Sequence, residues 1–238
     1  TIIGIFGEDD SDTLHQGEFG QIILDKTPFY AESGGQVGDQ GSFDSDKGVF
    51  EVMDTQFSGN AYSHFGTVSN GQISVGDKIL ATVNPVRRKS ITLNHTGTHM
   101  LHRALMMVLG EHVQQRGSLV DDEKIRFDFS HHQSLTTTEI REIETIVNEK
   151  IEENIDVQTS IMKHDEAIDS GAMALFGEKY GEDVRVLDVG DFSKELCGGT
   201  HVKNTNEIGI FKVVSESSIS SGTRRIEAIT GDKALKWA

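Results

Sequence analysis

The segment NHTGTHMLH (residues 94–102) contains three histidines within nine residues, and the segment CGGTH (residues 197–201) places the only cysteine of the chain four residues before another histidine. If the first segment is helical, His95 and His99 are one turn apart and lie on the same face. His102 falls on that face as well. Two imidazoles placed in this way can reach a single metal ion.

The second segment offers a thiolate and an imidazole with the same spacing, and its two glycines allow the backbone to turn tightly between them. Zinc accepts this mixture of nitrogen and sulfur donors and is usually tetrahedral in structural sites. The sequence therefore predicts one zinc ion, with ligands drawn from His95, His99, Cys197 and His201. The spacing leaves open whether His201 completes the coordination or stands beside the ion. Four protein ligands are typical of a structural site, and three with a water of a catalytic one.

Two other interpretations of the same residues remain open at this point. Cys197 could be a small buried apolar residue with His201 incidental to it. It could instead be the nucleophile of a cysteine hydrolase, which requires an exposed thiolate of low pKa and a third group that orients the histidine. The sequence pattern identifies no such third group.

Length and composition restrict the class of protein. The 238 residues suffice for one large domain or two modest ones. Hydrophobic residues make up 36% of the chain, and no apolar run approaches the roughly 20 residues of a membrane span. The N-terminal TIIGIFGEDDSD has neither the basic flank nor the cleavage site of a signal peptide and no initiator Met. With a single cysteine, these features predict a cytoplasmic piece of a processed or excised chain.

The charge argues against a surface that coats nucleic acid generally. The formal net charge is −16, and residues 1–84 carry 3 Lys or Arg against 13 Asp or Glu. A polyanion such as a nucleic acid could therefore bind only at a local basic cluster, either residues 87–89 or Arg224 and Arg225. Clusters of this size are more often solvated surface than binding sites.

Residues 1–86 have the pattern of short strands separated by turns such as Asn70-Gly71 and Gly76-Asp77. This pattern predicts a small N-terminal β-barrel with a glycine-rich loop. The segment NPVRRKS (84–90) is interpreted as a linker because it contains one of only two prolines followed by basic residues.

Residues 87–238 alternate helical and strand patterns and predict an α+β fold with helices packed on a largely antiparallel sheet. The first helix is expected to begin at Ser90 or Thr92 and to end at Gly110, with an apolar stripe opposite the histidine face. A second helix begins at a capping box formed by Thr136 and Glu139. Other predicted elements are a short helix near 164–175 and strands at 124–130, 155–163, 183–190, 209–220 and 222–231.

Five segments together resemble the editing domain of bacterial alanyl-tRNA synthetases. A sixth, TPFYAESGGQVGDQG (27–41), resembles the glycine-rich part of the β-barrel that precedes that domain. The HxxxH and CxxxH pairs alone are shared with stand-alone AlaX-type deacylases and with the threonyl-tRNA synthetase editing domain. The five segments are NHTGTHMLHRALMMVLGEHVQQRGSLV (94–120), IRFDFSH (125–131), GAMALFGEKYG (171–181), ELCGGTH (195–201) and TRRIEAITG (223–231), of which GAMALFGEKYG favours the synthetase.

The resemblance implies zinc-dependent hydrolysis of the ester that links serine or glycine to the 3′ adenosine of tRNA(Ala). An editor is needed because a small synthetic pocket cannot reject glycine by size and excludes one added hydroxyl only weakly. The implied partners are the aminoacylated end of tRNA(Ala) and the remaining synthetase domains, which include the ATP-dependent domain that ligates alanine; neither DNA nor a membrane is implied. The alternatives are a zinc-stabilised tRNA-binding module without its own chemistry and a stand-alone AlaX-type deacylase.

The resemblance also implies roles for individual residues. Thr98 matches a position expected to recognise the serine hydroxyl, Gln115 one that fixes the attacking water or the ester carbonyl, and Arg224 one that engages the terminal phosphates or supports the pocket. For substrate binding, the glycine-rich loop contributes Gly34, Gly35 and Glu32.

Overall fold

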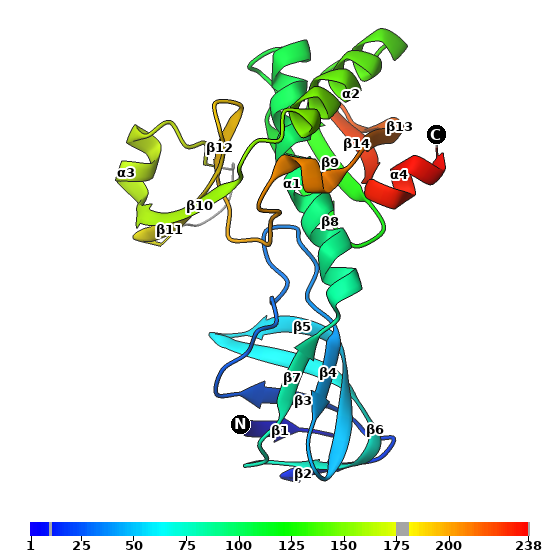
Figure 1. Ribbon diagram of the computed structural model, residues 1–238, viewed down its shortest axis with the longest axis vertical. Helices are drawn as coiled ribbons and strands as arrows, with labels where there is room; N and C mark the ends of the chain where they lie inside the picture. The colour runs from blue at the N-terminus through cyan, green and yellow to red at the C-terminus, as the bar shows by residue number, and fades with distance from the viewer. Residues whose placement is uncertain (10, 175–180, 238) are drawn as a thin grey trace. The chain divides into compact units, whose positions relative to one another are not determined.

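The computed structural model describes residues 1–9, 11–174 and 181–237 (Figure 1). The chain forms two compact units, one of residues 1–33 and 37–88 and the other of residues 34–36 and 89–238. Helices and antiparallel sheets together make the chain α+β, as predicted. No helix within the described ranges combines the length and the apolar character needed to span a membrane.

The first unit is a seven-stranded antiparallel sheet in the order β1-β3-β6-β5-β4-β7, with β2 paired to β6. Alternate residues of β3 are buried, so that one face of the strand packs into an apolar core around Phe43, Phe50 and Ile73. The strands are β1 (Ile2–Phe6), β2 (Thr13–His15), β3 (Phe19–Leu24), β4 (Gly41–Asp44), β5 (Gly48–Ser58), β6 (Ala61–Ser74) and β7 (Leu80–Val83).

The predicted β-barrel is not confirmed. The pairing path ends at β1 on one edge and at β7 on the other, and no ladder joins these edges in the described part of the chain. Ile2 alone bridges toward β7, exchanging backbone hydrogen bonds with Gly76 and Asp77 in the turn that precedes it. A barrel requires a continuous ladder between its first and last strands, whereas this contact is limited to a single residue.

The linker expected at 84–90 is wrong, because this segment is the beginning of helix α1 (Pro85–Leu109). The side chain of Asn84 accepts hydrogen bonds from the backbone N–H groups of Val86 and Arg87, both at 3.1 Å, and so caps the helix. Pro85 occupies the first helical position, where a missing N–H has no cost. The predicted end is confirmed, since Gly110 adopts φ +113° and its N–H reaches Met106 O at 2.9 Å.

The second unit contains two antiparallel sheets, as expected of its largely antiparallel pattern. The four-stranded sheet has the order β13-β14-β9-β8 and the three-stranded sheet the order β10-β11-β12. The sequence pattern did not reveal β8, β12 or the C-terminal helix α4 (Gly231–Trp237). The strands are β8 (Gln115–Val120), β9 (Ile125–Ser130), β10 (Gln158–Lys163), β11 (Asp183–Val189), β12 (Ser193–Leu196), β13 (Phe211–Ser220) and β14 (Thr223–Thr230).

Helix α2 (Thr137–Glu152) has the predicted capping box, in which the Thr136 hydroxyl accepts from Glu139 N–H and the Glu139 carboxylate accepts from Thr136 N–H. Helix α3 (His164–Asp169) is shorter than the expected 164–175. Residues 175–180 of the GAMALFGEKYG motif lie outside the described residues. A short 3₁₀ helix, η1 (Thr205–Ile208), precedes β13.

Helix α1 packs directly on the four-stranded sheet. Leu101 and Leu105 are fully buried together with Phe127 of β9. A Cβ atom at Gly97 would lie 3.2 Å from both Ile125 Cδ1 and Thr230 Cγ2, so glycine permits this close approach. Both the apolar stripe and the histidine face of α1 lie inside the unit, because all nine residues of 94–102 are buried.

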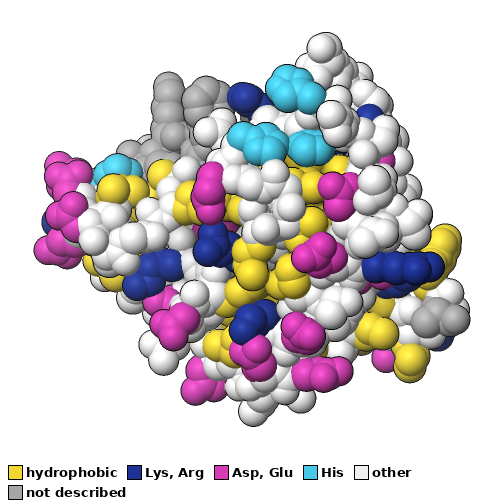
Figure 2. All heavy atoms as spheres, turned by 90° about the horizontal axis from the view of Figure 1, so that it is seen from above, with side chains coloured by type: hydrophobic (Ala, Val, Ile, Leu, Met, Phe, Trp, Pro, Cys, Tyr) yellow, Lys and Arg dark blue, Asp and Glu magenta, His cyan; other side chains and the backbone are white. Residues whose placement is uncertain are grey.

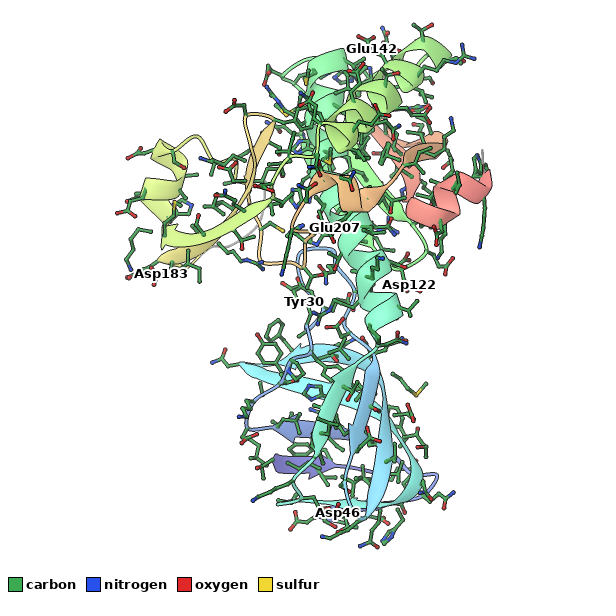
Figure 3. All side chains as sticks on the ribbon, in the orientation of Figure 1. Tyr30, Asp46, Asp122, Glu142, Asp183 and Glu207 are labelled. Carbon is green, nitrogen blue, oxygen red and sulfur yellow. The ribbon has the colours of Figure 1, made fainter. Side chains whose placement is uncertain are left out.

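The negative charge is spread over the surface of both units. Figure 3 labels Asp46 in the turn between β4 and β5, Glu142 on α2 and Asp183 at the start of β11 among the acidic side chains that project from the ribbon. Asp183 forms an exposed ion pair with Lys163, of a kind that contributes little to stability.

The cap at Asn84 can be tested by substitution. Asn84→Ala removes both side-chain hydrogen bonds, and we expect it to lower the free energy of unfolding by about 1 kcal/mol. Asn84→Asp retains the acceptor and should match the unaltered chain. The measurement is urea denaturation followed by circular dichroism. Equal stability of the Ala and Asp variants would show that residue 84 belongs to a linker after all.

Candidate metal centre

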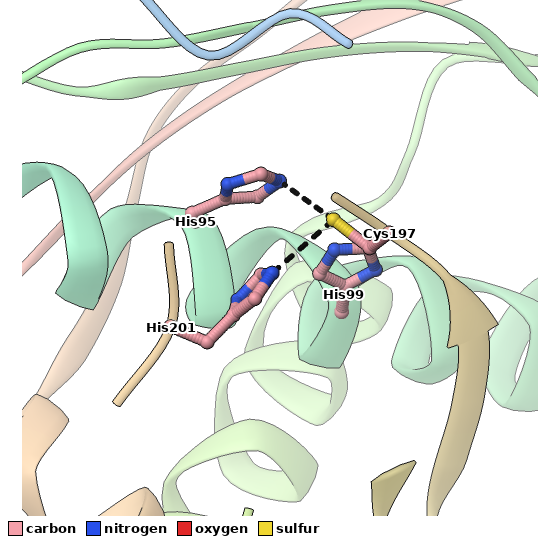
Figure 4. Close-up of side chains that lie close together, drawn as sticks. All are labelled: His95, His99, Cys197 and His201. Carbon is pink, nitrogen blue, oxygen red and sulfur yellow. Dashed lines mark hydrogen bonds between the residues drawn. The ribbon is translucent and has the colours of Figure 1, made fainter. Parts of the chain in front are cut away.

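The structure brings the side chains of His95, His99, Cys197 and His201 together (Figure 4). One donor atom from each residue lies within 4.8 Å of every other. The two histidines of α1 are buried, whereas the cysteine and histidine of the loop after β12 are partly exposed. The cluster therefore borders the surface on the side of the CGGTH loop.

The distances suit a small tetrahedral ion. Cys197 Sγ lies 3.4 Å from His95 Nε2 and 3.2 Å from His201 Nε2. Tetrahedral zinc with ordinary Zn–S and Zn–N bonds has donor-to-donor distances of about 3.3–3.6 Å. The Nε2 atom of His99 is buried without a hydrogen-bond partner within the described residues, as a nitrogen directed at an ion would be. The residues present fit zinc.

The CGGTH loop reaches the helix because Gly199 has no side chain. A Cβ atom at residue 199 would lie 2.1 Å from His95 Cε1 and 2.8 Å from Gln36 Oε1, whereas one at Gly198 would meet nothing within 4 Å. Arg185 of β11 fixes the loop by donating hydrogen bonds to the carbonyl oxygens of both glycines, at 3.2 Å and 2.6 Å.

The second nitrogen of each histidine contacts a polar group that the sequence patterns did not single out. His95 Nδ1 lies 2.6 Å from Gln36 Oε1, and His99 Nδ1 lies 2.8 Å from Glu195 Oε2. His201 Nδ1 lies 3.2 Å from the hydroxyl of Thr96, which is buried on α1. The third histidine of the opening segment, His102, lies 3.4 Å from the other oxygen of Glu195 and does not belong to the cluster.

Burial and neighbouring groups favour the ligating forms of two donors, Cys197 and His201. For His99, in contrast, burial lowers the pKa, but Glu195 and Cys197 raise it by more than burial lowers it. Burial raises the pKa of the Cys197 thiol. The nearby His95, His99 and His201 together lower it by more than burial raises it, so that the pKa lies well below its usual range. Burial, and then the proximity of His95, lower the pKa of His201 to about 3. At neutral pH the cluster therefore presents a thiolate and a neutral imidazole, which are the forms that bind zinc.

The buried carboxylate behind His99 remains ionised. Burial raises the pKa of Glu195. His99 and His102 together lower it by more than burial raises it, so that the pKa of Glu195 lies far below its usual range. Glu195 is 2% exposed and also accepts a hydrogen bond from Ser193 Oγ at 3.2 Å. A full negative charge thus lies directly behind one of the four donors.

The other residues singled out by resemblance lie elsewhere in the second unit. Thr98 is buried next to His99 on α1, and its hydroxyl donates to Asn94 O at 2.8 Å. Gln115 and Arg224 both pair with Phe129 of β9, one from β8 and the other from β14, so the three form one cross-strand row. Directly opposed residues point to the same face of a sheet, and Gln115 and Arg224 are therefore two strand spacings apart, about 10 Å. Arg224 is ion-paired with Glu216 of β13.

The glycine-rich loop is divided between the two units. Gly34, Gly35 and Gln36 belong to the second unit, where Val120 N–H donates to Gly35 O at 2.7 Å. Gly35 has φ +84°, and a Cβ atom there would lie 2.3 Å from Ser118 Oγ, so this contact requires glycine. Glu32 belongs to the first unit, is exposed, and has its N–H bonded to Thr55 O at 2.9 Å.

Comparison with known proteins is consistent with this arrangement. Residues 1–87 match the family model of class II (A) tRNA synthetases, and residues 184–227 match the second additional domain of threonyl and alanyl tRNA synthetases. The chain thus has segments of a class II aminoacyl-tRNA synthetase.

The relatives identify the family more narrowly. The chain is 54% identical over 224 residues to an alanine–tRNA ligase of Nitrosococcus oceani and 53% identical over 237 residues to one of Legionella pneumophila. These matches cover 94% and 99% of the chain but only 26% and 28% of the relatives. A Nitrosomonas eutropha alanine–tRNA ligase is 50% identical over 227 residues, or 95% of the chain and 26% of that relative. The chain belongs to the alanyl-tRNA synthetase family and spans about a quarter of the length of these members.

The two glycines of the CGGTH loop provide a matched test of the cluster. Gly199→Ala places a methyl group on the His95 ring, and we expect zinc affinity to fall about 10-fold or more. Gly198→Ala meets only open space and should leave the affinity unchanged. Competition with a chromophoric chelator measures both values. Equal affinities of the two variants would contradict the observed packing of the loop against α1.

Proposed function

We propose that the chain hydrolyses the ester that joins serine or glycine to the 3′ adenosine of tRNA(Ala), within a protein that ligates alanine to the same tRNA at the expense of ATP. The proposal rests on one observation above all: two donor pairs about a hundred residues apart in the sequence meet at one point near the surface. Membership of the alanyl-tRNA synthetase family supports the choice of substrate.

In the proposed reaction, water attacks the ester carbonyl carbon, the bond to the ribose oxygen breaks, and free amino acid and a ribose hydroxyl are released. Bound zinc would supply positive charge and Lewis acidity beside the ester. The chain's own residues would orient the reactants. The amide of Gln115 can donate to the ester carbonyl or accept from the water, and the bulge between Gln115 and Gly117 turns Gln115 onto the face of the sheet that carries Phe129.

Thr98 is proposed to recognise the serine side chain. Its hydroxyl proton is already engaged by Asn94 O, so the Oγ1 atom can act toward a substrate only as an acceptor. The hydroxyl of serine can donate to this atom, whereas alanine has no group that can. Glycine lacks the hydroxyl as well, and its hydrolysis must depend on positioning beside the cluster rather than on Thr98.

Arg224 is proposed to support the site rather than to bind phosphate with a free guanidinium group. Its side chain is 11% exposed and its Nε atom donates to the carboxylate of Glu216, which is 9% exposed. A partly buried pair of this kind holds both side chains in place, and removing one partner leaves the other charge without its counter-charge. Gly34, Gly35 and Glu32 are proposed to contact the RNA end from the glycine-rich loop.

A purely architectural role for the metal is the second candidate. It is favoured by the number of protein donors, because four of them fill the coordination of tetrahedral zinc. In that case the chain would be a zinc-stabilised module that binds tRNA without chemistry of its own.

Incubation of the chain with Ser-tRNA(Ala) separates the two candidates. We expect release of serine by the unaltered chain and loss of at least about 100-fold in Cys197→Ala, because the metal would no longer be held. Circular dichroism and tRNA binding must show that the variant remains folded. No release of serine by the unaltered chain, with tRNA binding intact, would favour the architectural module.

Further variants test the individual roles. Thr98→Val should slow hydrolysis of Ser-tRNA(Ala) about 10-fold and leave Gly-tRNA(Ala) unaffected, because only serine offers a hydroxyl. Equal effects on the two substrates would remove Thr98 from serine recognition. Activity that survives chelation but is abolished by thiol alkylation would instead identify Cys197 as a nucleophile.

A further inference from the structure

We infer that Gln36, Glu195 and Thr96 are positioning residues that fix the tautomer and orientation of the three imidazoles of the metal centre. Each places a polar oxygen against the Nδ1 atom of a different histidine, at 2.6, 2.8 and 3.2 Å respectively. The inference depends on metal binding but not on the proposed hydrolysis.

The geometry selects one nitrogen of each ring for the metal. A neutral imidazole carries its proton on only one nitrogen, and the group bonded to that nitrogen determines which one it is. An oxygen that accepts from Nδ1–H leaves Nε2 as the lone-pair donor. In this cluster the Nε2 atoms of His95 and His201 face Cys197 Sγ, and that of His99 has no other partner in the described part of the chain.

Gln36 holds His95 and the CGGTH loop at the same time. Its Oε1 atom contacts His95 Nδ1 and also accepts from the backbone N–H of Thr200, at 2.9 Å, and from the Thr200 hydroxyl, at 3.2 Å. The side chain is completely buried. A single amide oxygen thus connects the glycine-rich loop, the HxxxH helix and the CxxxH loop.

Thr96 plays the corresponding part for His201 from within α1. Its hydroxyl donates to Thr92 O at 3.1 Å and accepts from Val202 N–H at 3.2 Å. Because the hydroxyl proton is used by Thr92, the contact with His201 Nδ1 must be a hydrogen bond donated by the imidazole. The Thr92 carbonyl thus determines, through the Thr96 hydroxyl, that Nδ1 is the protonated nitrogen of His201.

Glu195 adds charge to its positioning role. A zinc ion with one thiolate and three neutral imidazoles carries a net charge of +1, and such a charge is costly in a buried site. The Glu195 carboxyl group lies behind His99, close to this charge, with Oε2 2.8 Å from Nδ1. A carboxylate acceptor also makes the imidazole a stronger donor to the metal.

Substitutions at Gln36 test the inference through zinc affinity. Gln36→Leu keeps the size of the side chain but removes the acceptor, and we expect zinc affinity to fall 10- to 100-fold. Gln36→Glu restores an acceptor oxygen and should bind zinc at least as tightly as the unaltered chain. Asn148→Leu is the matched control, because it removes a similar amide away from the cluster. The Asn148 side chain accepts from Phe211 N–H at 2.9 Å and donates to Phe211 O at 3.0 Å.

The control separates positioning from general destabilisation. Asn148→Leu should lower stability without changing zinc affinity. Equal zinc affinity of Gln36→Leu and the unaltered chain, or equal losses in Gln36→Leu and Gln36→Glu, would overturn the role of Gln36.

A second measurement needs no variant, so that a failure of Gln36→Leu to fold leaves the inference testable. Long-range ¹H–¹⁵N spectra of the zinc-loaded, unaltered chain distinguish the two imidazole nitrogens. We expect a protonated Nδ1 and a metal-bound Nε2 at residues 95, 99 and 201. A metal-bound Nδ1 at any of the three would contradict the inference, whatever the outcome of the hydrolysis assay.

Discussion

The close approach of the CGGTH loop to helix α1 is the constraint on which the rest of the structure depends. The loop can lie against the His95 ring only because residue 199 has no side chain, and the backbone carbonyls on either side are held by Arg185. This contact converts two local patterns into a single site. Without it, the chain would have a pair of histidines on a buried helix and a cysteine and histidine on a loop.

Several side chains of the polar segment of α1 form hydrogen bonds inside the unit, whereas His99 Nε2 and both ring nitrogens of His102 have no hydrogen-bond partner among the described residues. Residues 94–102 are buried on every side of the helix, yet most are polar. Asn94 donates to Asp121 O and accepts from the Thr230 hydroxyl, and Thr98 bonds back to the helix. An unpaired polar group in this position would cost about 1–3 kcal/mol. The polar composition therefore reflects a network rather than an exposed helix face. Histidines also gather on the surface (Figure 2). In another pair, His112 Nε2 lies 2.9 Å from His131 Nδ1, but the only cysteine of the chain is not grouped with it, so the presence of Cys197 rather than the number of histidines distinguishes the metal centre.

The sequence was most informative where a pattern is local. The HxxxH and CxxxH spacings, the capping box at Thr136 and the glycine at the end of α1 each depend on residues within a turn of one another, and the structure has all of them. The beginning of α1 was missed because Pro85 and the basic residues after it resemble a linker, whereas Asn84 supplies a cap. Strand β8 was missed because the segment QRGSLV does not alternate between apolar and polar residues. The acceptors behind the histidines could not be predicted from spacing, since Gln36 lies 59 residues from His95 and Glu195 lies 96 residues from His99.

The central claim is that a single zinc ion is held by three imidazole Nε2 atoms and one thiolate. X-ray absorption at the zinc edge of the loaded chain tests it most directly, because sulfur and nitrogen neighbours scatter differently and at different distances. The account predicts one sulfur at about 2.3 Å and three nitrogens at about 2.0–2.1 Å. A coordination shell without sulfur, or one made mainly of oxygen, would contradict it.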